Sequence, residues 1–140
     1  MCRRNPGTFR NRKYLLDTHL LIWLSRGQAY LPQEVFACMS DSANRFFFSV
    51  ASLWEITIKN RRNQPDFRMD ARILRRGLLD AGYEELPILS QHVLAVDTLP
   101  PIHKDPFDRL LIAQAITEGI VLLTSDATVA QYPGPMRLAR

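Results

Sequence analysis

The chain has 140 residues, 46% of them hydrophobic, and a net charge of +4, which is enough material for one domain with its own core. Its longest apolar runs, such as LLIWL at 20–24, are too short to span a membrane, and the basic amino terminus lacks the apolar segment of a signal peptide. We therefore expect a cytoplasmic protein without a membrane segment.

Basic residues are concentrated at the start of the chain, where residues 1–13 contain five Lys and Arg and no acid. We expect residues 1–12 to form a basic, flexible tail and residues 13–140 to form a single domain. Within that domain, short apolar runs alternate with helical patterns. Strands are predicted at 13–17, 45–49, 83–88, 120–124 and 136–138. Helices are predicted at 18–27, 32–44, 50–62, 70–81, 90–99 and 105–119.

This alternation predicts an α/β fold with a mainly parallel sheet covered by helices on both faces. In such folds, ligands bind outside the carboxyl ends of the strands. Asp17 directly follows the first strand, and Asp126 follows the strand at 120–124. Both acids should therefore reach the same edge of the sheet. Each has an alternative role, because either could cap the helix or turn that follows it.

The stretch HKDPFDRLLIAQA at 103–115 has the features of a helix start. Asp105 is a favoured N-cap residue, Pro106 fits the first turn, and a negative charge at Asp108 suits the helix dipole. Taken alone, this stretch indicates capping rather than catalysis. The sequence does not fix where this helix begins relative to the sheet, but a shared crevice would give Asp108 a role beside the other acids.

Glu55 lies in a helical pattern whose spacing predicts a buried face. That face is expected to contain Val50, Leu53, Trp54 and Ile58. Glu55 is predicted at its border, next to Ala51 and Ser52, where a carboxylate could point into a cleft. The alternative is a surface ion pair with Lys59 four residues later.

Four crowded carboxylates would raise one another's pKa unless a cation neutralised them. Mg²⁺ or Mn²⁺ is the expected partner, because these ions prefer oxygen ligands, whereas zinc needs His or Cys at spacings that are missing here. We interpret His19, His92 and His103 as structural or surface residues. A basic stretch that begins four residues after Glu55 suits a polyanion, or is a solvated helix face. Its candidate polyanion-binding residues are Lys59, Arg61, Arg62, Arg72, Arg75 and Arg76.

Four segments, in order and covering roughly residues 13–138, resemble the acidic motifs of PIN-domain ribonucleases of the VapC toxin type. These segments are KYLLDTHLLIWL, SVASLWEITIKN, HKDPFDRLLIAQA and LLTSD. The resemblance implies a three-layer α/β/α fold and a toxin of a toxin–antitoxin pair. It further implies an endoribonuclease that uses Mg²⁺ or Mn²⁺ and a metal-activated water. As partners, it implies a VapB-like antitoxin, a second copy of the chain in a homodimer, and an RNA substrate. The basic residues between Lys59 and Arg76 would then be RNA-binding residues.

By position, the resemblance implies that Asp17, Glu55 and Asp108 hold the metal and that Asp126 completes the pocket. Thr124 matches a hydroxyl residue that supports the site, and we interpret Asp105 as the helix cap. Three alternatives stay open: a catalytically inactive PIN-like module that binds RNA or a partner, a receiver-like Mg²⁺-binding signalling domain, and a domain whose acids are only caps. The receiver-like alternative is weakened because no Lys follows the strand at 120–124.

Overall fold

The protein is described by a computed structural model that covers residues 12–27 and 30–139, so residues 1–11 of the predicted tail lie outside the described part. Five strands form one sheet in the order β3-β2-β1-β4-β5, and every neighbouring pair is parallel. The strands are β1 (Lys13–Leu16), β2 (Arg45–Ser49), β3 (Glu84–Leu86), β4 (Val121–Thr124) and β5 (Met136–Leu138). The predicted α/β class is confirmed, and the sheet is parallel throughout.

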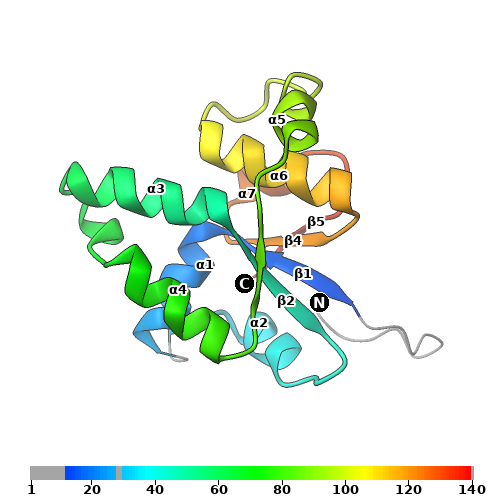
Figure 1. Cartoon of the computed structure of the whole chain (residues 1–140). Coiled ribbons are helices and arrows are strands. Elements are labelled where there is room, and N and C mark those ends of the chain that lie inside the picture. Colours follow the sequence, from blue (N-terminus) through cyan, green and yellow to red (C-terminus); the bar gives the residue numbers. More distant parts are fainter. Residues whose placement is uncertain (1–11, 28–29, 140) are drawn as a thin grey trace.

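Helices cover both faces of this sheet, which gives the expected three layers (Figure 1). They are α1 (Thr18–Arg26), α2 (Gln33–Met39), α3 (Val50–Arg61), α4 (Ala71–Asp80), α5 (Ser90–Val96), α6 (Pro106–Glu118) and α7 (Ala127–Ala130). Helices α1, α2 and α4 pack on one face, whereas α5, α6 and α7 pack on the other. No helix in the described ranges is long and apolar enough to cross a membrane.

Two apolar cores hold the layers together, and strand alternation decides which residue enters which core. Tyr14 and Leu16 of β1 face the core under α1, α2 and α4, while Leu15 faces the core under α6. Helix α3 lies at the boundary, because Ile56 enters the first core and Ala51 enters the second. Full burial of a large aliphatic or aromatic side chain contributes roughly 1.5–3 kcal/mol.

The sheet order places a topological switch point between β1 and β4. From β1 the chain moves outward through β2 to β3, and it then crosses to the other side of β1 to form β4. A crevice at the carboxyl ends of β1 and β4 is where ligands bind in open parallel sheets. The backbone N–H of Asp17 donates to the carbonyl oxygen of Leu123 at 3.0 Å, which joins the two strand ends at this point.

Most predicted elements are present, but the helix predicted to reach residue 44 ends at Met39. Asp41 explains the early stop, because its Oδ1 accepts a hydrogen bond from the backbone N–H of Ala43 at 2.9 Å. Such a local side-chain bond satisfies the backbone outside a helix. By contrast, α6 ends where predicted, since Gly119 adopts the left-handed conformation (φ 69°) at its carboxyl end.

Candidate active site

Asp17 is fixed at the carboxyl end of β1 by three hydrogen bonds. Its Oδ1 accepts from the N–H of Leu20 at 2.9 Å and so caps α1, while its Oδ2 accepts from the Thr124 hydroxyl at 2.7 Å and from the N–H of Ser125 at 3.1 Å. Burial raises the pKa of Asp17, and these hydrogen bonds act in the opposite direction. Asp17 therefore caps α1 and also lies at the switch point.

Thr124 and Asp126 form the β4 side of the same site. The Thr124 hydroxyl, which donates to Asp17, also accepts from the N–H of Asp126 at 3.0 Å. Asp126 caps α7, because its Oδ1 accepts from the N–H of Thr128 at 2.8 Å. Partial burial raises the pKa of Asp126, but the Thr128 N–H and His103 outweigh it and hold this pKa below its usual value.

The predicted buried face of α3 is wrong, because Val50, Leu53 and Ile58 are only partly buried and Trp54 is exposed. The buried residues of α3 are Ala51, Ser52, Glu55 and Ile56. Glu55 is only 2% exposed, and Trp54, which was expected inside, is 54% exposed. The face that meets the site carries small and polar side chains, so apolar spacing alone could not identify it. Glu55 lies within the buried face instead of at its border.

Two side chains hold the Glu55 carboxylate. The Thr18 hydroxyl donates to its Oε1 at 2.6 Å, and the Lys59 ammonium lies 2.5 Å from its Oε2. The pair with Lys59 thus exists, but it is buried and not a surface pair. Lys59 also lies 3.3 Å from Oδ2 of Asp105. Burial lowers the pKa of Lys59, but Glu55 and Asp105 together raise it above its usual value.

Helix α6 brings Asp108 to the same edge of the sheet. Its carboxyl end leads directly into β4, so the helix runs back across the sheet and its first turn lies near the carboxyl ends of the strands. Asp105 caps this turn, since its Oδ1 accepts from the N–H of Phe107 at 2.8 Å and from the N–H of Asp108 at 3.2 Å. The sequence left the position of Asp108 open, and the structure places it among the other acids.

The Asp108 carboxyl is strongly perturbed by its surroundings. Burial, followed by the negative charges of Asp105 and Glu55, raises its pKa to about 7, while His103 acts against this and Asp17 adds to it. The mutual influence of these carboxylates shows that their charges are crowded. The predicted clustering of the acids is therefore present in the fold.

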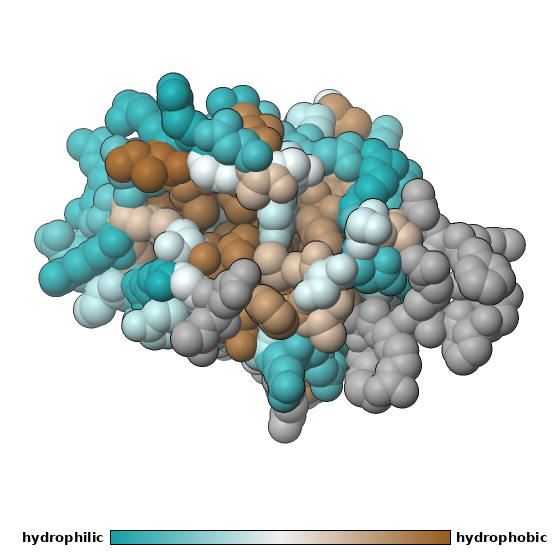
Figure 2. Space-filling view, turned by 90° about the horizontal axis from the view of Figure 1, so that it is seen from below, coloured by the Kyte–Doolittle hydropathy of each residue, from teal (hydrophilic) through white to brown (hydrophobic). Residues whose placement is uncertain are grey.

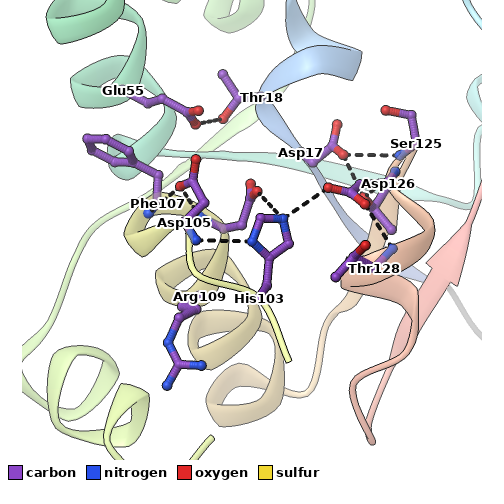
Figure 3. A network of polar contacts seen from close by, with 12 residues as sticks. Asp17, Thr18, Glu55, His103, Asp105, Phe107, Arg109, Ser125, Asp126 and Thr128 are labelled. Carbon is purple, nitrogen blue, oxygen red and sulfur yellow. Dashed lines mark hydrogen bonds and ion pairs between the residues drawn. The ribbon is translucent and has the colours of Figure 1, made fainter. Parts of the chain in front are cut away.

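His103 belongs to the site, which the sequence analysis did not predict. Its Nε2 lies 3.2 Å from Oδ2 of Asp108 and 3.1 Å from Oδ2 of Asp126, so it joins the two carboxylates. Figure 3 shows its contact with Asp126. Its Nδ1 accepts a hydrogen bond from the N–H of Asp105 at 3.0 Å. An accepting Nδ1 places the proton of a neutral ring on Nε2, so His103 donates to the acids in this arrangement.

The donor set fits a hard divalent cation. Within the described ranges, His103, Asp108 and Asp126 form a group whose possible ligand atoms all lie within 4.8 Å of one another. The His103 proton on Nε2 leaves the carboxylates as the available ligands, and oxygen ligands suit Mg²⁺ or Mn²⁺. A cation would also relieve the charge crowding that raises the pKa of Asp108. Asp17 accepts three hydrogen bonds, so its two oxygens keep a lone pair for a ligand.

The six candidate RNA-binding residues have different surroundings. Lys59 is held inside the site by Glu55 and Asp105, and Arg75 pairs with Glu85 at 2.7 Å. The other candidates are exposed and are Arg61, Arg62, Arg72 and Arg76. Arg61 and Arg72 line one hollow of about 330 Å³ between α3 and α4.

The sequence model of the PIN domain family matches residues 14–135, and the chain belongs to this family. PIN domains are generally nucleases. No curated protein matches the chain.

Solved structures with similar folds include VapBC2 from Rickettsia felis bound to a DNA fragment from its promoter, with 14% identity, a TM-score of 0.67, and coverage of 91% of this chain and 99% of that chain. VapBC-1 from nontypeable Haemophilus influenzae has 18% identity, a TM-score of 0.60, and coverage of 90% and 97%. PAE2754 from Pyrobaculum aerophilum has 17% identity, a TM-score of 0.54, and coverage of 95% and 90%. At these identities the likeness concerns the fold.

Proposed function

We propose that the protein is a Mg²⁺- or Mn²⁺-dependent endoribonuclease and the toxin of a toxin–antitoxin pair. One observation carries the nuclease proposal: four acids from four separate segments of the chain gather at the switch point of a PIN-family sheet. They are Asp17, Glu55, Asp108 and Asp126. Helix caps alone do not explain this gathering, because Glu55 caps nothing and is buried beside a cation.

These four acids would hold the metal. When bound, the cation would activate a water molecule and neutralise charge on the phosphodiester, which is the chemistry such ions supply in nucleases. Thr124 orients the Asp17 carboxylate through its hydroxyl, and Asp105 fixes the first turn of α6. His103 holds the Asp108 and Asp126 carboxylates toward each other.

The exposed arginines on α3 and α4 support an RNA substrate. Arg61 and Arg72 line one hollow and Arg72 and Arg76 line another, and these side chains, with Arg62, would contact phosphates of the RNA. Such contacts are independent of sequence and weaken as salt is added, because counterions released from the nucleic acid drive them. Cytoplasmic RNA is the substrate that we propose.

The protein partners are proposed from the VapBC complexes and from one surface. A hollow of about 620 Å³ between α1, α2 and α4 is lined largely by apolar side chains, including Leu24, Met39, Ile73 and Leu78. On the face seen in Figure 2, apolar side chains gather between polar margins. Exposed apolar patches of this kind mark protein interaction sites. We propose that a VapB-like antitoxin binds the protein and that the toxin itself is a homodimer.

The deciding experiment is cleavage of a mixed RNA pool by the purified protein in Mg²⁺ or Mn²⁺ and in EDTA. Asp108→Asn is compared with Asp80→Asn, which changes an exposed aspartate at the end of α4. We expect metal-dependent cleavage that Asp108→Asn abolishes and Asp80→Asn retains. Equal cleavage by all three proteins would indicate a contaminant. Absence of cleavage, together with a melting temperature that metal still raises, would favour a non-catalytic PIN-like module.

A further inference from the structure

Two aromatic side chains lie at the rim of the acid site, and neither has a role in the proposed metal binding. Trp54 directly precedes Glu55 on α3, and Phe107 directly precedes Asp108 on α6. Their ring centroids lie 5.0 Å apart with the ring planes at 79°, which is the edge-to-face arrangement of an aromatic pair. The pair therefore joins the two helices that carry the helix-borne acids.

Trp54 is unusually open for a residue next to a buried site. It is 54% exposed although its neighbour Glu55 is 2% exposed, so the helix turns its indole outward at the point where the carboxylate turns inward. Phe107 is half-buried and lies beside Glu55 and Asp105 in the close view of the site (Figure 3). A rigid contact with Phe107 fixes the indole, while much of the indole surface stays available to a ligand.

The charges around this pair indicate which ligand would bind. The Lys59 ammonium lies 5.7 Å from the Phe107 ring centroid and contacts Glu55 and Asp105, so the pair adjoins the acids directly. On the other side, Arg61 lies seven residues after Trp54 and thus on the same face of α3. Among the residues that the structure describes, Arg61 is exposed and has no ion-pair partner.

An aromatic ring between a phosphate-handling site and an exposed arginine is the arrangement by which proteins hold single-stranded nucleic acid. The bases stack on aromatic side chains, while basic residues follow the backbone. A purely apolar protein partner would not require the neighbouring acids or Arg61. We propose that Trp54, supported by Phe107, is a stacking subsite for an unpaired nucleobase of the RNA beside the cleaved phosphodiester. This inference rests on the proposed nuclease function and assigns its substrate as single-stranded at this position.

Trp54 fluorescence tests this proposal directly, since the chain has two tryptophans and Trp23→Phe leaves Trp54 as the sole reporter. All binding measurements are made in Mg²⁺ with Asp108→Asn added to prevent cleavage. The probes are a short single-stranded oligoribonucleotide and an abasic sugar–phosphate oligomer of equal length. We expect the RNA to quench Trp54 and the abasic oligomer to bind at least about tenfold more weakly, in line with the stacking of one base.

In the same background, with Trp23 retained and binding measured with a labelled oligonucleotide, Trp54→Ala should weaken RNA binding by at least about tenfold. Trp54→Phe should retain most of the affinity. Tyr30→Ala removes another exposed aromatic ring and should change nothing. Equal binding of RNA by the Asp108→Asn protein with and without Trp54→Ala, or equal binding of RNA and abasic oligomer, would overturn the stacking subsite. A changed oligomeric state of Trp54→Ala with unchanged RNA affinity would overturn it in favour of a protein interface.

The wild-type cleavage assay separates the two proposals. Metal-dependent cleavage by a protein whose Trp54 does not respond to RNA would leave the nuclease proposal intact and overturn the stacking subsite. Neither cleavage nor RNA binding would overturn both.

Discussion

The acids that follow strands and the acids carried on helices meet at one site but are stabilised differently. Asp17 and Asp126 accept hydrogen bonds from the backbone N–H groups of Leu20, Ser125 and Thr128. Glu55 and Asp108 instead contact side chains: Lys59 and Thr18 for Glu55, and His103 for Asp108. The comparison teaches that backbone hydrogen bonds favour the charged forms of the strand-borne acids, although burial still raises the pKa of Asp17, whereas the helix-borne acids depend on nearby side chains and on the proposed metal.

Lys59→Met should have the largest effect on stability, because it leaves the buried Glu55 carboxylate without its cation. Removing one partner of a buried ion pair typically costs about 3–5 kcal/mol. We expect urea unfolding of the metal-free variant to show a loss of this size. Adding Glu55→Gln should recover much of it. If the double variant is as unstable as Lys59→Met alone, Lys59 acts through its cation–π contact with Phe67 and not through its pair with Glu55.

Thr124→Val should have the next largest effect on stability, and it tests how the acids that follow β1 and β4 are held. The change keeps the side-chain volume but removes the donor to Asp17 and the acceptor for the N–H of Asp126. Leaving buried polar groups unpaired costs about 1–3 kcal/mol. Thr117→Val, on the exposed face of α6, is the matched control and should lie within about 0.5 kcal/mol of wild type. Equal stability of the two variants would mean that Asp17 does not depend on Thr124.

Asp108→Asn should act in the opposite direction and stabilise the metal-free protein. The folded-state pKa of Asp108 is raised from 3.8 to about 7, so the folded state binds more protons than the unfolded state between these values. The contribution of the Asp108 carboxyl to the free energy of unfolding therefore falls as pH rises from about 4 to about 7. At pH 8 in EDTA we expect the variant to be more stable by about 1–3 kcal/mol.

At pH 4 the same variant should have nearly the same stability as the wild type, because Asp108 of the wild type is then protonated in the folded state. Unfolding curves of both proteins at the two pH values check this difference. An equal difference in unfolding free energy at both pH values would show that ionisation of Asp108 does not destabilise the folded protein. In the wild type, Mg²⁺ should raise stability more at pH 8 than at pH 5, because the metal competes with the proton.

Asp126→Asn should have the smallest effect on stability. Asparagine caps helices about as well as aspartate, and the side chain of Asp126 is 42% exposed. We expect a change of less than about 0.5 kcal/mol in urea unfolding, together with weaker Mg²⁺ binding by calorimetry. A large loss of stability would show that the charge of Asp126, and not its backbone hydrogen bond, holds this part of the site.

Local signals in the sequence predicted much of the fold. RFFFS at 45–49 coincides with β2, and Asp105 and Gly119 begin and end α6 as their residue types indicate. The acids at the ends of β1 and β4 were also predictable, because the carboxyl ends of parallel strands share one edge of a sheet.

The features that could not be predicted depend on contacts between distant parts of the chain. Trp54 looked like a core residue because helical spacing does not show which neighbours a face will meet. His103 contacts Asp126 across 23 residues of sequence, and nothing in its local sequence marks this contact. The first turn of α6 could be placed only once its direction relative to β4 was known.

The hydrogen bond between Thr124 and Asp17 joins residues that are 107 positions apart. Contacts of such high sequence separation form late, because closing the intervening chain costs entropy before any contact is gained. No amino-terminal fragment that lacks β4 can complete the site. During synthesis, the pocket therefore cannot form until nearly the whole chain, β4 included, has been made. The nascent chain has no complete active site before that point.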